Sequence, residues 1–129
     1  MSAHLRTTGL MLALVAAGCA DREAEPLAVV RGRVTYRGAP LPGGLVVFTP
    51  DDDYGSRGPQ AEGAVGTDGR FFLSTAGKTG AAAGKYRVTV VGADGWPLPA
   101  KFMDPNQSGL RAEVIAGREN VLDFKLEEK

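Results

Sequence analysis

The feature that most constrains the fold of this chain is a regular alternation of apolar and polar residues. It is clearest in residues 30–37, where every second residue belongs to one less polar face: Val30, Gly32, Val34 and Tyr36. Side chains of a β-strand point to opposite faces in turn, so this period of two predicts a half-buried strand. The arginines between those positions form a basic face. Its simpler interpretation is a solvated outer surface, and its alternative is a binding stripe.

The same alternation predicts strands in residues 86–90, 110–114 and 122–126. Residues 45–49 form a continuous apolar run that predicts a central strand, and residues 64–66 and 70–74 are predicted as short strands on either side of a turn. Turns rich in Gly and Pro separate them, and the pair Asp68-Gly69 is typical of a tight hairpin. Such a series predicts an all-β chain folded as a seven-stranded antiparallel β-sandwich. We expect large aromatic side chains in its core, from Tyr36, Phe48, Phe71, Tyr86 and Phe124.

The beginning of the chain has a different character. Arg6 precedes an apolar stretch of about ten residues, which suits the hydrophobic region of a signal peptide. The stretch is too short to span a membrane, which needs roughly 20 apolar residues. It ends in Ala16-Ala17-Gly18, directly before Cys19. An alternative interpretation is a cysteine buried in a helix of the core.

This junction resembles the bacterial lipobox, in which a small residue and Gly precede the cysteine that becomes acylated. Ala16 stands where the pattern usually has Leu. The resemblance implies lipid attachment at Cys19 and anchoring in the cell envelope. Ala20, rather than Asp, follows Cys19, so we expect the periplasmic face of the outer membrane. The predicted organisation is a signal peptide in residues 1–18, a tether in residues 19–27 and a sandwich domain in residues 28–129.

The order of several segments resembles the carboxypeptidase regulatory-like, or transthyretin-like, β-sandwich. The segments that carry this resemblance are residues 32–43, 46–48, 67–71 and 84–90. Residues 98–105 and 108–110 are similar to segments of short bacterial lipoproteins of this type. The resemblance implies an envelope location and a sandwich fold, and it implies no established activity.

Charge and residue inventory exclude several classes of function. The chain has 15 basic and 15 acidic side chains, a balance that argues against nucleic-acid binding. Removal of residues 1–18 would take away His4, the single histidine, and acylation would use the single cysteine. Catalysis by Ser-His-Asp or Cys-His pairs and zinc binding would then lack their residues. We therefore predict a protein that is not an enzyme and has no cofactor and no metal.

Two loops contain candidate ligand-binding residues. Asp51, Asp52 and Asp53 form the densest acidic run, and calcium prefers oxygen ligands, but the spacing of a calcium-binding loop is absent. A solvated loop tip is the simpler interpretation. Tyr54 follows this run. Trp96 could stack on a sugar, seat a partner or close the open end of the sandwich.

These inferences lead to two hypotheses. The first is a lipid-anchored, non-catalytic β-sandwich of the cell envelope that acts as a structural or protein-interaction module. Its partners would be the membrane, through the anchor, and an envelope protein. The alternative is a surface module that binds calcium or carbohydrate through the Asp-rich loop and Trp96. This alternative requires both loops to lie at the same end of the sandwich, which the sequence leaves open.

Overall fold

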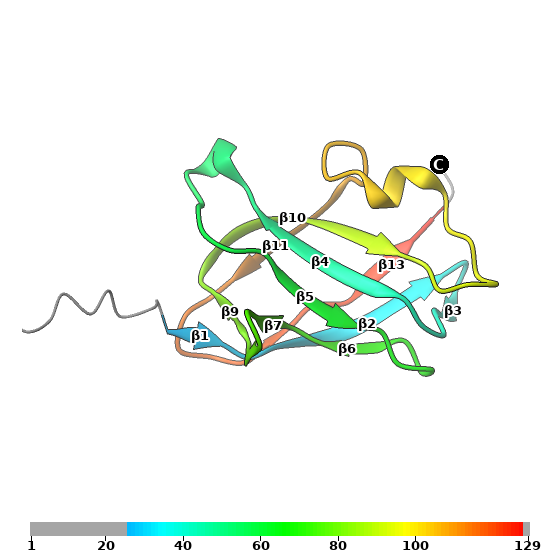
Figure 1. The fold of residues 1–129 in the computed structure, drawn as a ribbon, viewed down its shortest axis with the longest axis horizontal. Helices are drawn as coiled ribbons and strands as arrows, with labels where there is room; N and C mark the ends of the chain where they lie inside the picture. The colour runs from blue at the N-terminus through cyan, green and yellow to red at the C-terminus, as the bar shows by residue number, and fades with distance from the viewer. Residues whose placement is uncertain (1–25, 128–129) are drawn as a thin grey trace, which may run out of the picture.

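The computed structural model describes residues 26–127, and in this range it consists of short β-strands, two short 3-10 helices and no α-helix (Figure 1). The strands form two main sheets and a small two-stranded sheet. The predicted all-β class with antiparallel sheets is therefore confirmed. One predicted strand, in residues 70–74, is divided into two shorter ones.

The first sheet is antiparallel throughout and has the order β11-β10-β4-β5-β7-β8. Its two longest strands, β4 and β10, pair from Pro50 opposite Tyr86 to Leu45 opposite Val91. The strands of this sheet are β4 (Leu45–Pro50), β5 (Ala61–Ala64), β7 (Ser74–Thr75), β8 (Lys78–Thr79), β10 (Gly84–Val91) and β11 (Leu110–Val114).

The second sheet is organised around β2 (Val30–Tyr36). This strand pairs antiparallel with β3 (Ala39–Pro40) and β6 (Arg70–Phe72), and parallel with β12 (Asn120–Val121) and β13 (Phe124–Leu126). The two parallel pairings depart from the predicted wholly antiparallel arrangement. They arise because, after β11, the chain runs alongside β2 in the same direction as β2. The small third sheet joins β1 (Leu27–Ala28) to β9 (Ala81–Ala82).

The core lies between the two main sheets. Phe48 of the first sheet and Phe124 of the second meet edge to face, with ring centroids 5.9 Å apart. Phe71 stacks on Phe124, and Tyr86 packs against Phe48. These four predicted core aromatics are buried, whereas Tyr36 is only partly buried and packs against the core. Removal of this apolar surface from water is the main force that holds the two sheets together.

The predicted strand over residues 70–74 is divided by a change of sheet. Residues up to Phe72 pair with β2, whereas Ser74 pairs with β5 in the other sheet. Leu73 lies between them with its side chain buried, and its N–H donates to the carbonyl of Val30 at 2.9 Å. The prediction of one continuous strand was wrong because this segment spans the gap between the two sheets.

The Asp68-Gly69 turn forms where it was predicted but has a different role. Asp68 accepts a hydrogen bond from the N–H of Arg70 at 3.1 Å, and Gly69 has a φ of 83°. The turn connects β5 to β6, which lie in different sheets, so it does not close a hairpin. The preceding strand also ends earlier than predicted, at Ala64 rather than Gly66. A short hairpin, β7-β8, forms instead in the segment that was predicted to be a loop.

Two 3-10 helices lie in the connections outside the sheets. One, η1 (Asp52–Tyr54), follows the end of β4, and the other, η2 (Ala100–Met103), lies in the long connection between β10 and β11. Phe102 of η2 is buried. These two connections contain the predicted candidate residues.

Candidate functional site

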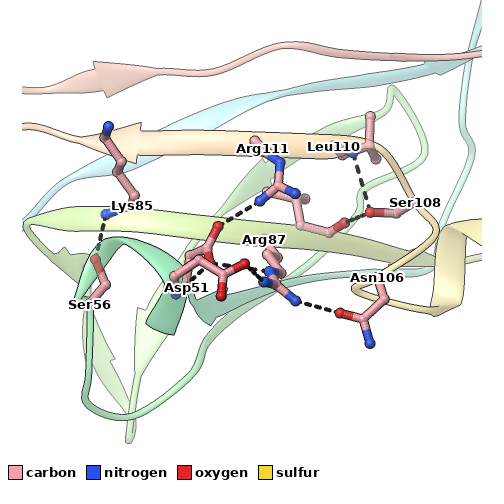
Figure 2. Close-up of polar contacts among 10 residues, drawn as sticks. Asp51, Ser56, Lys85, Arg87, Asn106, Ser108, Leu110 and Arg111 are labelled. Atoms are coloured by element: carbon pink, nitrogen blue, oxygen red, sulfur yellow. Dashed lines mark hydrogen bonds and ion pairs between the residues drawn. The ribbon is translucent and has the colours of Figure 1, made fainter.

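The Asp-rich loop contains a buried carboxylate. Asp51 follows β4 directly and is 1% exposed, the only charged side chain that is buried in residues 26–127. Its Oδ1 accepts hydrogen bonds from the Nε of Arg87 and the N–H of Asp53, each at 3.2 Å. Its Oδ2 accepts from a terminal nitrogen of Arg111 at 2.6 Å. Figure 2 shows both arginines reaching Asp51 from the neighbouring strands β10 and β11.

Arg87 extends this cluster to the next connection. One of its terminal nitrogens donates to Oδ2 of Asp53 at 2.6 Å, and the other donates to the side-chain oxygen of Asn106 (Figure 2). Ser108, close by, donates its hydroxyl to the carbonyl of Val88 at 2.6 Å. The cluster therefore ties the Asp-rich loop and the connection after η2 to the first sheet.

The geometry of Asp51 determines what its carboxylate can do. Both oxygens already accept charge-assisted hydrogen bonds from guanidinium groups, which are strong and directional. A cation would have to displace these arginines before it could bind Asp51. For Asp51, the interpretation as part of a solvated loop tip was wrong, because the side chain points inward to the two arginines. Its arrangement is that of a structural clamp.

The other residues of this loop face solvent. Asp52 and Asp53 are exposed, and Tyr54 is 60% exposed. The ammonium group of Lys85 lies 4.2 Å from the centre of the Tyr54 ring, a cation–π contact. Tyr54 and Lys85 line a shallow recess of about 280 Å³ with Arg111 and Glu113. In residues 26–127, no group of three or more acidic, His or Cys side chains is arranged to hold a metal ion.

Trp96 lies far from the Asp-rich loop. The loop follows Pro50, whereas Trp96 follows Val91, and these two residues lie at opposite ends of the paired strands β4 and β10. Trp96 is 52% exposed, and its backbone N–H donates to the carbonyl of Ala93 at 2.9 Å. The structure therefore does not bring the two predicted candidate regions together.

A groove on the outer face of the second sheet was not predicted as a site. It has a volume of about 320 Å³ and is lined by Arg31, Gly32, Arg33, Arg70, Phe71, Phe72, Val121 and Asp123. Strand pairing places Phe72 on one side of Arg31 and Val121 on the other. Both apolar side chains are more than half exposed. The alternation in residues 30–37 indicated the basic face, but nothing local identified the strands on either side.

The arginines of this groove differ in their partners. Arg31 pairs with Glu119, and Arg70 lies 3.6 Å from Asp68. The backbone N–H of Arg33 donates to Asp123 at 3.0 Å, while its guanidinium makes no ion pair with the residues that the structure describes. The groove therefore combines exposed apolar side chains with a guanidinium that has no ion pair within residues 26–127.

The predicted lipid-attachment residue, Cys19, lies outside the described residues, as do the predicted signal peptide and most of the tether. Among residues 26–127, no helix has the length and apolar character that a membrane crossing requires.

No family model matches the sequence, and no curated protein matches it. Among solved structures, a DUF3823 family protein from Parabacteroides merdae is similar, with 20% sequence identity and a TM-score of 0.46. The match covers 78% of this chain and 46% of that protein, so this chain spans less than half of its neighbour's length.

Proposed function

We propose that this chain is a lipid-anchored, non-catalytic protein of the cell envelope and that its β-sandwich acts as a protein-interaction module. The observation that carries the interaction role is the groove on the outer face of β2 and β6. The order of the sequence motifs supports a sandwich of the carboxypeptidase regulatory-like type. The anchor and the groove have separate tests.

The chemistry of the groove suits a protein partner. Phe72 and Val121 expose apolar surface that no other described part of the chain covers, and Arg31 lies between them. Aromatic and arginine side chains are enriched at protein interfaces, where they supply both contact area and hydrogen bonds. The guanidinium of Arg33 adds a donor for a carboxylate or carbonyl of the partner.

A non-catalytic role agrees with the residues available. Residues 26–127 contain neither His nor Cys. Asp51, their single buried charged side chain, has both oxygens engaged by arginines. The remaining acidic side chains lie at the surface, where no described cleft gathers them for paired acid–base work.

The proposed anchor rests on residues 16–19, which resemble a lipobox, and on Ala20 as the next residue. The first strand begins at Leu27, so a short polar tether would hold the sandwich close to the membrane. We place the protein on the periplasmic face of the outer membrane because Ala20, rather than Asp, follows Cys19.

The anchor is tested by the intact mass of the protein purified from a membrane fraction, beside a Cys19→Ala variant. We expect a chain that starts at Cys19 and carries acyl groups, and no acylated species from the variant. A soluble chain that retains residues 1–18 would contradict the anchor.

The interaction role is tested by placing a photo-crosslinking amino acid at Phe72 in cells of the source organism. The matched control is Tyr54, an equally exposed aromatic residue in η1, outside the groove. We expect a discrete adduct with an envelope protein from position 72 that Arg33→Glu abolishes, and no adduct of that mass from position 54. Equal adducts from both positions would contradict a role for the groove.

A further inference from the structure

The first sheet has an open edge at β11. This strand pairs with β10 on one side, from Leu110 opposite Val88 to Val114 opposite Gly84, and no other strand in residues 26–127 pairs with it. An edge strand leaves alternate backbone N–H and C=O groups without partners and can pair with a further strand. The edge of β11 is therefore a surface on which another chain can add.

The pairing shows which backbone groups face outward. The carbonyl of Lys85 accepts from the N–H of Asp51 at 2.9 Å, so the backbone groups of Lys85 face away from β11. Glu113 lies directly opposite Lys85 and therefore directs its own N–H and C=O to the open edge. By the alternation of a strand, Arg111 does the same. These two residues carry the free backbone groups of the edge.

The sequence of β11 is self-complementary. Its five residues read Leu-Arg-Ala-Glu-Val, with Ala112 at the centre. If a second copy pairs antiparallel with its two-fold axis at Ala112, Arg111 lies opposite Glu113 of the other copy, and Leu110 lies opposite its Val114. Opposite charges across a strand pair stabilise it, and like charges destabilise it.

This register also satisfies the backbone. Arg111 of one copy and Glu113 of the other would exchange two N–H to C=O bonds, and the symmetry would repeat them on the other side of Ala112. A shift that places Arg111 opposite Arg111, or Glu113 opposite Glu113, would bring like charges together. This register therefore satisfies the backbone groups of the edge and, unlike those shifts, also pairs opposite charges.

We infer that this chain forms a two-fold symmetric dimer by antiparallel pairing of β11 with β11 of a second copy. The assembly joins the two first sheets into one continuous sheet. Two-fold dimers are the commonest symmetric assembly, and their interface consists of one patch that complements itself. This inference concerns self-association and is independent of the proposed anchor and of the groove on the second sheet.

The side chains that would meet are available. Glu113 is exposed and has no ion pair with the described residues, and Lys85 opposite it directs its ammonium group to the Tyr54 ring. Arg111 is 57% exposed and uses one terminal nitrogen on Asp51. Its remaining N–H groups can donate to Glu113 of the second copy.

Ala112 provides a direct test of the register. Opposed residues in such a non-hydrogen-bonded pair have Cα atoms about 4.5 Å apart, within the range of roughly 4.4–6.8 Å that disulfides require. In the full chain with Cys19→Ala, we expect Ala112→Cys to oxidise to a covalent dimer at low protein concentration. Val121→Cys, at an exposed position on the other sheet, is the control and should stay monomeric under the same oxidation. No covalent dimer from position 112, or equal yields from both positions, would overturn the proposal.

A charge reversal tests the same interface without a disulfide. Glu113→Arg would place arginines opposite one another twice in the dimer, and we expect the dissociation constant from sedimentation equilibrium to rise about tenfold or more. Glu62→Arg is the matched control, because Glu62 is exposed on an inner strand of the same sheet. A protein that stays monomeric up to millimolar concentration would overturn the proposal. A dimer that both variants weaken equally would also overturn it.

Discussion

Asp51 and Arg111 lie 60 positions apart in the sequence, yet Oδ2 of the buried carboxylate accepts a 2.6 Å hydrogen bond from the guanidinium. The contact joins the end of β4 to the edge strand β11, across β10 between them. A third residue, Arg87 on β10, binds the other oxygen of the same carboxylate. One acidic side chain therefore holds three neighbouring segments of the first sheet.

Asp51→Ala should destabilise the fold by about 1–3 kcal/mol. Arg87 would lose a buried partner, and the short helix η1 would lose its N-cap. The partial exposure of both arginines keeps the loss below that of a fully buried pair. The free energy of unfolding in urea measures the effect. Asp52→Ala, at an exposed position in the same loop, should change it by less than about 0.5 kcal/mol. Equal effects of the two variants would contradict the clamp.

Asn120→Asp should destabilise the protein by about 1–3 kcal/mol, although the side chains of aspartate and asparagine have nearly the same shape. The Nδ2 group of Asn120 donates to the carbonyls of Ile115 and Arg118 at 3.1 and 3.0 Å, and the side chain is nearly buried. Aspartate would direct an oxygen at these carbonyls in place of a donor. Thermal unfolding measures the loss. Glu119→Gln, at the exposed neighbour, is the control, and an equal fall in melting temperature would argue against the role of the amide.

Gly32→Ala should disrupt the second sheet. A Cβ at this position would lie 1.8 Å from the carbonyl oxygen of Leu122, and backbone cannot yield as a flexible side chain can. We expect a loss of about 3 kcal/mol or more, or failure to fold. Gly38→Ala, where the added carbon meets open space but φ is +80°, should cost only about 1 kcal/mol. Circular dichroism and urea unfolding distinguish the two, and a mild effect at Gly32 would show that the strands separate easily there.

Millimolar calcium should leave the melting temperature unchanged. A ligand that binds only the folded protein raises its stability, but both oxygens of Asp51 already accept from arginines. Melting with calcium and then with a chelator tests this. A calcium-dependent rise that Asp53→Asn removes would restore the ion-binding interpretation of the loop.

The sequence predicts those parts of the fold that depend on local alternation. The strands at Val30–Tyr36 and Leu110–Val114 lie within a residue of their predicted positions, because in each an exposed face alternates with a more buried one. Leu45–Pro50 was predicted from a continuous apolar run and is an inner strand of the first sheet. The change of sheet at Leu73 and the parallel pairing of β12 and β13 depend on partners far along the chain, and no local pattern marks them.

The candidate site is less predictable for the same reason. Asp51, Asp52 and Asp53 are chemically identical in sequence, and only the fold makes Asp51 buried. Its partners Arg87 and Arg111 lie 36 and 60 positions away. The basic face of residues 30–37 was visible as a pattern, but Phe72 and Val121 became its neighbours only through long-range pairing.

The position of β2 has a consequence for how the chain acquires its structure. This strand comes early in the sequence. It pairs on one side with β6 and on the other with β13, which is formed about 90 residues later, by Phe124–Leu126. During synthesis from the N-terminus, β2 must wait for Phe124 and Leu126, both buried in the core, before its second side is covered. Pairing between distant segments slows folding because a long loop must close first. The sandwich of a nascent chain would therefore remain incomplete until residues 124–126 have been made, and removal of β13 would leave residues 34–36 of β2 without a partner strand on one side.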